Sequence, residues 1–382
     1  MVAAVRQGLS QRSVAYRFGV SLRTVQDWVQ RARGQRLDRV DWSDHRQRPR
    51  RAPNRTPPAL EDTVLALRRQ LRLSILGEAG AEAIHAALAA MHGPAPSVRT
   101  IGRILVRHGQ IDGPHRERQP PPPPGWYLPA VRTRRVELEL FDFIEMLKLQ
   151  GGPLLDVLTG IGLHSGLPAA WPLPEATTTR VLACLTAHWA VSGCPGYAQF
   201  DNDTRFQGAH QHPHVFGRVV RLCLQLGITP VFAPPREFGL QNPIEHFNGL
   251  WQAKVWRRFQ FAELAALVAT NAHYLAARQQ RNAARAADAP PRQPWPQGWS
   301  WRPQSLVAGT VVYIRRTTDQ GRITVLGQSW GVDRHWCHRL VRAEVDLHAG
   351  AMRCYALRRR APADQPLLCE RPYDYPRNDL VR

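Results

Sequence analysis

Five consecutive prolines, Pro120 to Pro124, divide the chain. Proline has no backbone N–H and a fixed φ, so such a run cannot lie inside a helix or a central strand. It is expected to form a stiff polyproline spacer, roughly 15 Å long at about 3.1 Å per residue. We therefore expect a proline-rich linker over residues 113–134 with separately folded parts on both sides. A chain of 382 residues has room for roughly two to four domains.

The first 33 residues are patterned as two short helices joined by a tight turn. Ser10 is placed to cap the first helix, Gly19 supplies the turn, and Ser21 caps a second helix that runs to about Arg31. This spacing is typical of a helix-turn-helix over residues 1–33, although a helical hairpin that binds nothing is the alternative. The side chains that the second helix would offer to a DNA major groove are Arg23, Thr24 and Gln26.

Residues 34–59 are rich in arginine and poor in apolar periodicity, which indicates a basic linker or an inert spacer. Helical periodicity resumes over residues 60–112, where Ser97 can cap a further helix. We interpret this segment as a second helix-turn-helix that turns Arg99 and Arg103 toward DNA. A helical brace for the next domain is the alternative.

The pattern changes to strands after the prolines. Apolar strand runs come first over residues 135–285, and alternating helices and strands follow, which indicates a mixed α/β sheet covered by helices. A linker is expected over 286–304. Residues 305–360 then alternate between apolar and polar with regular glycines, which predicts a small antiparallel β-barrel, with a tail over 361–382.

The net charge of +21 favours a polyanionic partner, with nucleic acid as the first candidate. The six cysteines show no metal-binding spacing, and their scatter argues against a disulfide framework. No apolar run is long enough to cross a membrane and no signal peptide is visible. We expect a cytoplasmic protein without a membrane partner.

Three acids stand out by their positions. Asp142 lies within an apolar strand run, where a charge is costly unless a metal or partner satisfies it. Asp201 follows a short strand, and Glu245 lies on the polar face of a helix that starts at Pro243. Three such carboxylates can hold two divalent cations, and Mg²⁺ suits all-oxygen ligands. An arginine partner is the alternative for Asp142, and Asp156 is the main alternative for the first position.

Other side chains near these acids are less distinctive. His210, His212 and His214 alternate as metal ligands can, but without further ligands a polar loop is the favoured interpretation. Basic side chains on the Glu245 helix are placed to contact phosphates beside a cleaved bond, and ordinary solvated charge is the alternative. They are Lys254, Arg257 and Arg258.

The segments around the three acids resemble the motifs of DDE transposases and retroviral-type integrase cores. The residues that carry the resemblance are Phe141-Asp142-Phe143, Phe200-Asp201-Asn202-Asp203-Thr204-Arg205-Phe206 and Asn242-x-x-Glu245-x-Phe247-Asn248-Gly249. The likeness covers about residues 135–280, and the helix-turn-helix front with a small barrel behind resembles bacterial insertion-sequence transposases. It implies an RNase H-like fold with Asp142, Asp201 and Glu245 as catalytic metal ligands for Mg²⁺ or Mn²⁺, two ions in all.

Two departures from the family pattern are visible. Asp203 stands where a turn glycine is usual, although Asp tolerates positive φ better than most residues. Asp201 and Glu245 are also further apart than usual, with the surplus expected over residues 207–215. The zinc-binding front end of retroviral integrases is absent from the sequence, which favours the bacterial relatives.

The resemblance implies a transposase that binds double-stranded DNA, both element ends and target, as a homo-oligomer in the bacterial nucleoid. Its chemistry would be metal-dependent 3′-end cleavage followed by strand transfer. Two alternatives remain: a DNA-binding regulator with an inactive core, and an RNase H-like nuclease that cuts without joining.

Overall fold

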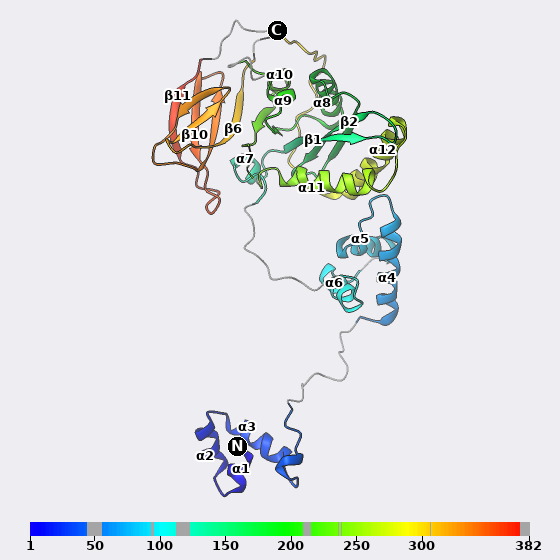
Figure 1. Cartoon of the computed structure of the whole chain (residues 1–382), viewed down its shortest axis with the longest axis vertical. Helices are drawn as coiled ribbons and strands as arrows, with labels where there is room; N and C mark the ends of the chain where they lie inside the picture. Colours follow the sequence, from blue (N-terminus) through cyan, green and yellow to red (C-terminus); the bar gives the residue numbers. More distant parts are fainter. Residues whose placement is uncertain are drawn as a thin grey trace. The chain divides into compact units, whose positions relative to one another are not determined.

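The computed structural model describes residues 1–43, 56–92, 95–111, 123–208, 215–235, 237, 239–305 and 307–374. The chain divides into two compact units, Met1–Leu60 and Glu61–Arg382 (Figure 1). Much of the predicted basic linker, most of the proline run and the three histidines at 210–214 lie outside the described residues.

The N-terminal unit is built from short capped helices. The side chain of Ser10 accepts the Ser13 N–H at 3.1 Å, Gly19 ends the first of the two predicted helices at φ 64°, and Ser21 accepts the Thr24 N–H at 3.1 Å. These observations confirm the predicted helix starts, because each serine satisfies an N–H that the helix leaves free. The elements are α1 (Val2–Arg6), α2 (Gln11–Phe18), α3 (Leu22–Arg31) and a 3-10 turn at Leu37–Arg39.

Three helices open the larger unit: α4 (Pro58–Leu73), α5 (Ala81–His92) and α6 (Val98–Arg107). Ser97 caps α6 by accepting the Thr100 N–H at 3.2 Å, as predicted. The carboxylate of Glu61 is buried and pairs with Arg107 and His108, which fastens α4 to the end of α6.

A mixed sheet forms the centre of the larger unit (Figure 1). Its first three strands form an antiparallel meander, and the next two run parallel to the first, so the order across this part is β3-β2-β1-β4-β5. The strands are β1 (Leu138–Lys148), β2 (Leu154–Gly162), β3 (Pro168–Leu173), β4 (Tyr197–Phe200) and β5 (Thr229–Phe232). This arrangement confirms the predicted mixed sheet and is consistent with an RNase H-like integrase core.

Helices cover both faces of this sheet because alternate strand residues point to opposite sides. Phe141 and Phe200 pack into one apolar core with α8 and α10, whereas Leu140 and Val231 pack into a second core with α11 and α12. The helices are α7 (Pro129–Arg132), α8 (Thr178–Ser192), α9 (Thr204–Gln207), α10 (Arg218–Gln225), α11 (Asn242–Trp251), a π-helical turn η2 (Gln252–Trp256), α12 (Leu264–Arg281) and α13 (Ala283–Ala287).

The C-terminal strands continue the central sheet. The added strands are β6 (Thr310–Arg316), β9 (Leu340–Asp346), β10 (Ala351–Ala356) and β11 (Leu367–Pro372), with a separate hairpin of β7 (Arg322–Val325) and β8 (Gln328–Gly331). β6 pairs with β5 in parallel, with Val312 opposite Val231 and Tyr313 opposite Phe232. The whole sheet then reads β11-β10-β9-β6-β5-β4-β1-β2-β3.

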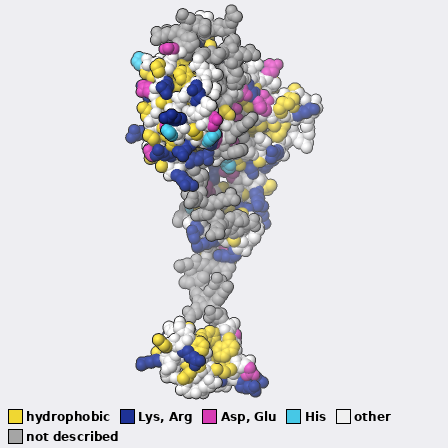
Figure 2. All heavy atoms as spheres, turned by 60° about the vertical axis from the view of Figure 1, so that its left-hand side comes forward, with side chains coloured by type: hydrophobic (Ala, Val, Ile, Leu, Met, Phe, Trp, Pro, Cys, Tyr) yellow, Lys and Arg dark blue, Asp and Glu magenta, His cyan; other side chains and the backbone are white. Residues whose placement is uncertain are grey.

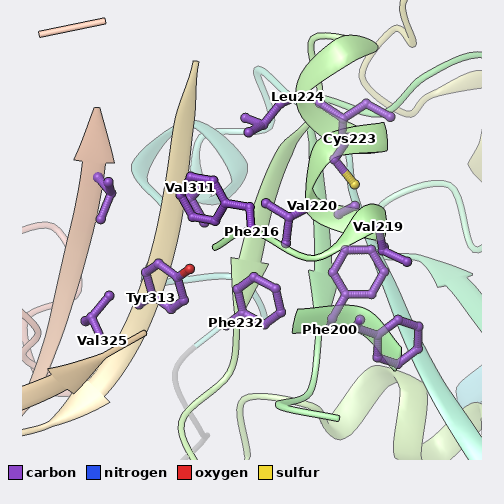
Figure 3. Packing of buried hydrophobic residues seen from close by; sticks show 14 of the residues in the cluster. Phe200, Phe216, Val219, Val220, Cys223, Leu224, Phe232, Val311, Tyr313 and Val325 are labelled. Atoms are coloured by element: carbon purple, nitrogen blue, oxygen red, sulfur yellow. The ribbon is translucent and has the colours of Figure 1, made fainter. Parts of the chain in front are cut away.

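This continuity corrects the expectation of a separate small barrel over residues 305–360. The predicted strands are present, but their apolar side chains share a core with β4, β5 and the helices that cover them (Figure 3). The ring of Tyr313 stacks on Phe232 at 5.3 Å, and Val311 packs into the same cluster. Alternation predicts strands but carries no information about the strand that pairs with their edge, and here that partner is β5. The last strand, β11, also lies in the segment predicted as a tail.

Among the described residues, none of the helices combines the length and the apolar character that spanning a bilayer requires.

Candidate active site

Asp142 lies on β1, and Asp201 directly follows the neighbouring parallel strand β4. Leu140 of β1 is opposite Gln199 of β4, so the same register two residues further on sets Asp142 beside Asp201. The rings of Phe141 and Phe200 stack with their centroids 5.5 Å apart, which shows that this register persists to the end of β4. Parallel strands lie about 4.8 Å apart, so both carboxyl groups leave the sheet at one place.

The Asp142 carboxylate faces α11. The residues before Asp142 and Asp201 point to the opposite core, and alternation turns both acids away from it. The amide of Asn248 on α11 donates to Asp142 Oδ2 at 2.9 Å, which confirms the direction of that side chain. The Asp203 N–H donates to Asp201 Oδ1 at 3.0 Å and fixes the second acid just beyond its strand.

Glu245 lies on the first turn of α11. Pro243 begins the helix, and Ile244, Phe247 and Trp251 form the buried stripe that fixes α11 against the sheet. This stripe leaves Glu245 exposed on the polar side of the helix. Its negative charge is one of those that raise the pKa of Asp142, so the third acid stands within electrostatic reach of the first.

A buried polar network holds Asp142 in place. Thr159 is opposite Asp142 on β2, and its hydroxyl donates to the Asp142 carbonyl at 3.0 Å; the Thr159 Oγ1 and Asn248 Oδ1 atoms are 2.7 Å apart. Thr159 is fully buried and Asn248 nearly so. Satisfied networks of this kind restrict a side chain to one orientation. The sequence pointed to Asn248 through its place on the polar face of the helix, whereas the only signal for Thr159 was a polar residue in an apolar strand.

The electrostatics of the pair disfavour ionisation. Burial, followed by the charges of Asp201, Glu245 and Glu145, raises the pKa of Asp142 to about 6, although its bond from the Phe143 N–H opposes the shift. Burial also raises the pKa of Asp201. Bringing a cation to these oxygens would relieve both effects, because the cation replaces lost hydration and neutralises the repulsion.

The three acids do not form a closed ligand set. In the part of the chain that the structure describes, no three acidic, histidine or cysteine side chains converge closely enough to hold a metal ion. The donor set nevertheless fits magnesium chemically, because it consists of carboxylate oxygens, two of them on adjacent strands and the third on a facing helix turn.

A second group of acids lies close by and is neutralised by Arg205. Its guanidinium bonds Asp203 at 2.6 and 2.9 Å, Asp156 at 3.2 Å and the carboxylate of Glu145, and it stacks on the ring of Phe143 at 3.7 Å. Asp156 is therefore an ion-pair partner, which argues against it as the first metal ligand. Arg205 lies in the Phe200–Phe206 motif, but the motif carries no information about the acids that this side chain pairs with.

Asp203 does not need the positive φ of the glycine it replaces. Its φ is −59° and ψ 141°, and its side chain caps α9 by accepting the Arg205 N–H at 2.7 Å. The departure from the family pattern is therefore accommodated by an ordinary N-cap.

The predicted DNA-reading side chains lie on the outer faces of their helices. Gln26 is exposed; Arg23 is exposed and pairs with Asp27 at 3.1 Å, while the hydroxyl of Thr24 lies 2.8 Å from that of Ser21. Arg99 and Arg103 are exposed on α6, opposite its buried stripe. Contact of these side chains with DNA stays a prediction.

The basic residues after Glu245 have protein partners. Arg258 donates to the carbonyls of Leu73 and Ser74 at 2.9 and 2.6 Å, and Lys254 donates to the Gly77 carbonyl at 3.2 Å. The α4–α5 loop is thus held against the core, as a helical brace would be, and these two side chains are partly committed there. Arg257 is exposed and bonds Gln252 at 3.2 Å.

Arginines also gather at the end of the sheet where β4, β5 and β6 terminate, which is the end that carries Asp201. Figure 2 shows dark-blue basic side chains over the C-terminal strands. Arg316 ends β6 beside the start of β9, and parallel pairing places the ends of β4, β5 and β6 on the same edge. The exposed arginines at this edge are Arg316, Arg339, Arg358 and Arg359.

No protein-family model matches the chain, and no curated protein matches it. Solved structures that match include a chain of the simian T-cell lymphotropic virus intasome in complex with PP2A regulatory subunit B56 gamma, at 16% identity and a TM-score of 0.34, covering 70% of this chain and 87% of that chain. The catalytic core domain of BIV integrase matches at 22% identity and a TM-score of 0.27, covering 35% and 79%. The HTLV-2 integrase catalytic core in complex with magnesium matches at 13% and 0.23, covering 29% and 64%. These three TM-scores are below 0.5, so the case for a function rests on the strands and side chains of this chain.

Proposed function

We propose that the chain is a DNA transposase or integrase that cleaves and joins phosphodiester backbones with divalent metal ions. The observation that carries the proposal is the parallel pairing of β1 with β4, with Leu140 opposite Gln199, because this register brings Asp142 beside Asp201 near the helix that bears Glu245. Among the described contacts no arginine is bonded to Asp142 or Asp201, and the negative charge of Glu245 acts on Asp142.

Asp142, Asp201 and Glu245 would hold Mg²⁺ or Mn²⁺, two ions in the proposed complex. Such ions polarise the scissile phosphate and activate the attacking oxygen. The protein supplies position: Asn248 and Thr159 fix the Asp142 carboxylate, and the Asp203 N–H fixes that of Asp201. Catalysis of phosphoryl transfer depends mainly on such positioning and on electrostatics.

The proposed reaction has two in-line steps. Water first attacks a phosphodiester and leaves a free 3′-hydroxyl at the element end. That hydroxyl then attacks a target phosphodiester, which breaks one P–O bond of the target strand as the new one forms. No covalent bond between protein and DNA is required.

DNA binding is proposed for three surfaces: the outer face of α3, the outer face of α6, and the exposed arginines at the C-terminal sheet edge. Arg23, Thr24 and Gln26 would read an element end, and phosphates would bind the basic edge. A homo-oligomer would hold two ends for joint cleavage. The bacterial insertion-sequence assignment and the cytoplasmic location belong to this proposal.

A strand-transfer assay on the full chain tests the proposal. Purified protein with labelled DNA that carries candidate element ends is expected to nick and join DNA with Mg²⁺ or Mn²⁺ and to do neither in EDTA. Asp201→Asn should lose both activities while its melting temperature stays near that of the wild type.

The assay also separates the alternatives. Nicking without joined product would favour the nuclease, and DNA binding without either activity would favour the regulator. Wild-type activity that Asp201→Asn retains would overturn the assignment of the site.

A further inference from the structure

Arg315 is a buried arginine that reaches the residue next to Asp201. It lies on β6, only 8% exposed, and takes part in no ion pair among the described residues. Its Nη2 donates to Asn202 Oδ1 at 2.8 Å, its Nη1 to the Ile314 carbonyl at 2.9 Å, and its Nε to the Thr324 carbonyl at 3.2 Å. Burial lowers the pKa of Arg315 to about 10.

Burying a guanidinium costs free energy of desolvation, which its hydrogen bonds must offset. Desolvation of an unpaired charge is rarely recovered from carbonyl dipoles alone, and an apolar side chain of similar volume would often be as stable. The planar fork of arginine, however, fixes several acceptors in one geometry. The acceptors here come from β6, from the β7 hairpin and from the loop after β4.

The bonds of Arg315 converge on the strand end that carries Asp201. The Asn202 amide donates to the Ala233 carbonyl at 2.6 Å, and weaker approaches of 3.4 Å join Arg315 Nη1 to the Phe232 and Ala233 carbonyls. Asn202 is thus held from two sides across the end of β5. Arg315 lies on the same face of β6 as Val311 and Tyr313, whereas the Asp142 carboxylate points to the other face of the sheet, so the clamp acts from behind the carboxylates.

We propose that Arg315 is a positioning residue for Asp201, which it orients through Asn202 without touching the carboxylate. The C-terminal strands are then part of the catalytic unit rather than an appended DNA-binding module. This inference rests on the proposed function for its kinetic consequence, whereas its structural consequence is independent of activity.

The first measurement is hydrogen–deuterium exchange of the full chain in EDTA. Arg315→Lys keeps the charge but cannot reach all the acceptors at once, so exchange in residues 201–205 should accelerate on the order of 10-fold. The matched control is Arg221→Lys, because Arg221 is equally buried and donates to the carbonyls of Pro303 and Ser305, away from the acids. This control should leave exchange in 201–205 unchanged.

The second measurement is cleavage kinetics. Arg315→Lys should lower kcat about 10- to 100-fold with little change in KM for DNA, because a small displacement of a ligand affects the reacting geometry more than binding. Asn202→Ala, which removes the clamp without disturbing a buried charge, should give a similar loss. The double variant should be no worse than either single one.

The outcomes distinguish this inference from the proposed function. Unchanged exchange in 201–205 for Arg315→Lys, or additive losses in the double variant, would overturn the positioning role. A wild-type protein that shows no metal-dependent cleavage would overturn the proposed function, and the exchange comparison would then still decide whether Arg315 holds the loop.

Discussion

Two groups of acids lie at the same end of the central sheet. One group has no arginine partner among the described contacts, and the other is paired with Arg205. Asp142 and Asp201 bond only neutral donors among the described contacts, and the pKa of each is raised. Asp203, Asp156 and Glu145 surround the guanidinium of Arg205, whose side chain is 18% exposed, and the pKa of Asp203 is lowered.

The difference shows how a protein can keep some carboxylates available for cations. An acid that already has an arginine partner gains little from a metal, whereas a buried acid beside another acid gains much. Arg205 bonds every acid of the second group, whereas no arginine is bonded to Asp142 or Asp201 among the described contacts.

The largest effect that would test this comparison is on catalysis. Asp142→Asn should lower metal-dependent cleavage by on the order of 1,000-fold or more, because an amide cannot supply the charge that holds a cation. Asp156→Asn should lower it less than about 10-fold, because this side chain serves Arg205. Both variants are isosteric, and single-turnover nicking at saturating Mg²⁺ measures them. Equal losses would mean that the two groups act as one site.

The next effect is on stability and concerns the second group. Arg205→Met removes the only cation bonded to three described carboxylates and should lower the free energy of unfolding by about 2 kcal/mol at pH 7. The estimate stays modest because Glu145 is 55% exposed and screened by solvent. Arg218→Met, on an exposed arginine that bonds Thr179 at 3.1 Å, is the matched control and should cost much less. Urea denaturation measures both, and equal midpoints would contradict a neutralising role for Arg205.

The local features of this fold could be predicted from sequence, and the long-range ones could not. Ser10, Ser21 and Ser97 cap helices as their positions indicated, and Asp201 follows a short strand, β4, as predicted. Each of these depends on a few neighbouring residues.

Pairings between distant segments gave no comparable signal. The addition of β6 to β5 replaced the predicted barrel, and Arg205 took Asp156 as a partner. Lys254 and Arg258 donate hydrogen bonds to backbone carbonyls between α4 and α5. In each case the partner depends on which strand edge or hydrogen-bond acceptor is still unpaired once the rest of the chain has folded. Residue type alone does not predict this.

The smallest effect is the change of folding stability with pH. The contribution of Asp142 to this change should be opposite in sign to that of Asp203. The pKa of Asp142 is raised to about 6 in the folded chain, so the folded state binds its proton more tightly than the unfolded state does. The stability of the metal-free protein should therefore fall as pH rises between about 4 and 6. The lowered pKa of Asp203 contributes the reverse, a stability that is present above about 4 and lost as pH falls further. Asp142→Asn should remove the first trend and, in EDTA at pH 7, should be more stable than the wild type by about 1–2 kcal/mol.

Adding Mg²⁺ should reverse this order, because a cation that needs the ionised carboxylate competes with the proton. The wild type should gain stability with Mg²⁺ above pH 6, and the pH of half-maximal cleavage should move down as Mg²⁺ is raised. Asp142→Asn should show neither change. Urea midpoints at pH 4.5, 5.5 and 7, with and without Mg²⁺, measure the stability terms. A wild type whose stability rises steadily over this range in EDTA would place Asp142 with the neutralised acids and remove the distinction between the two groups.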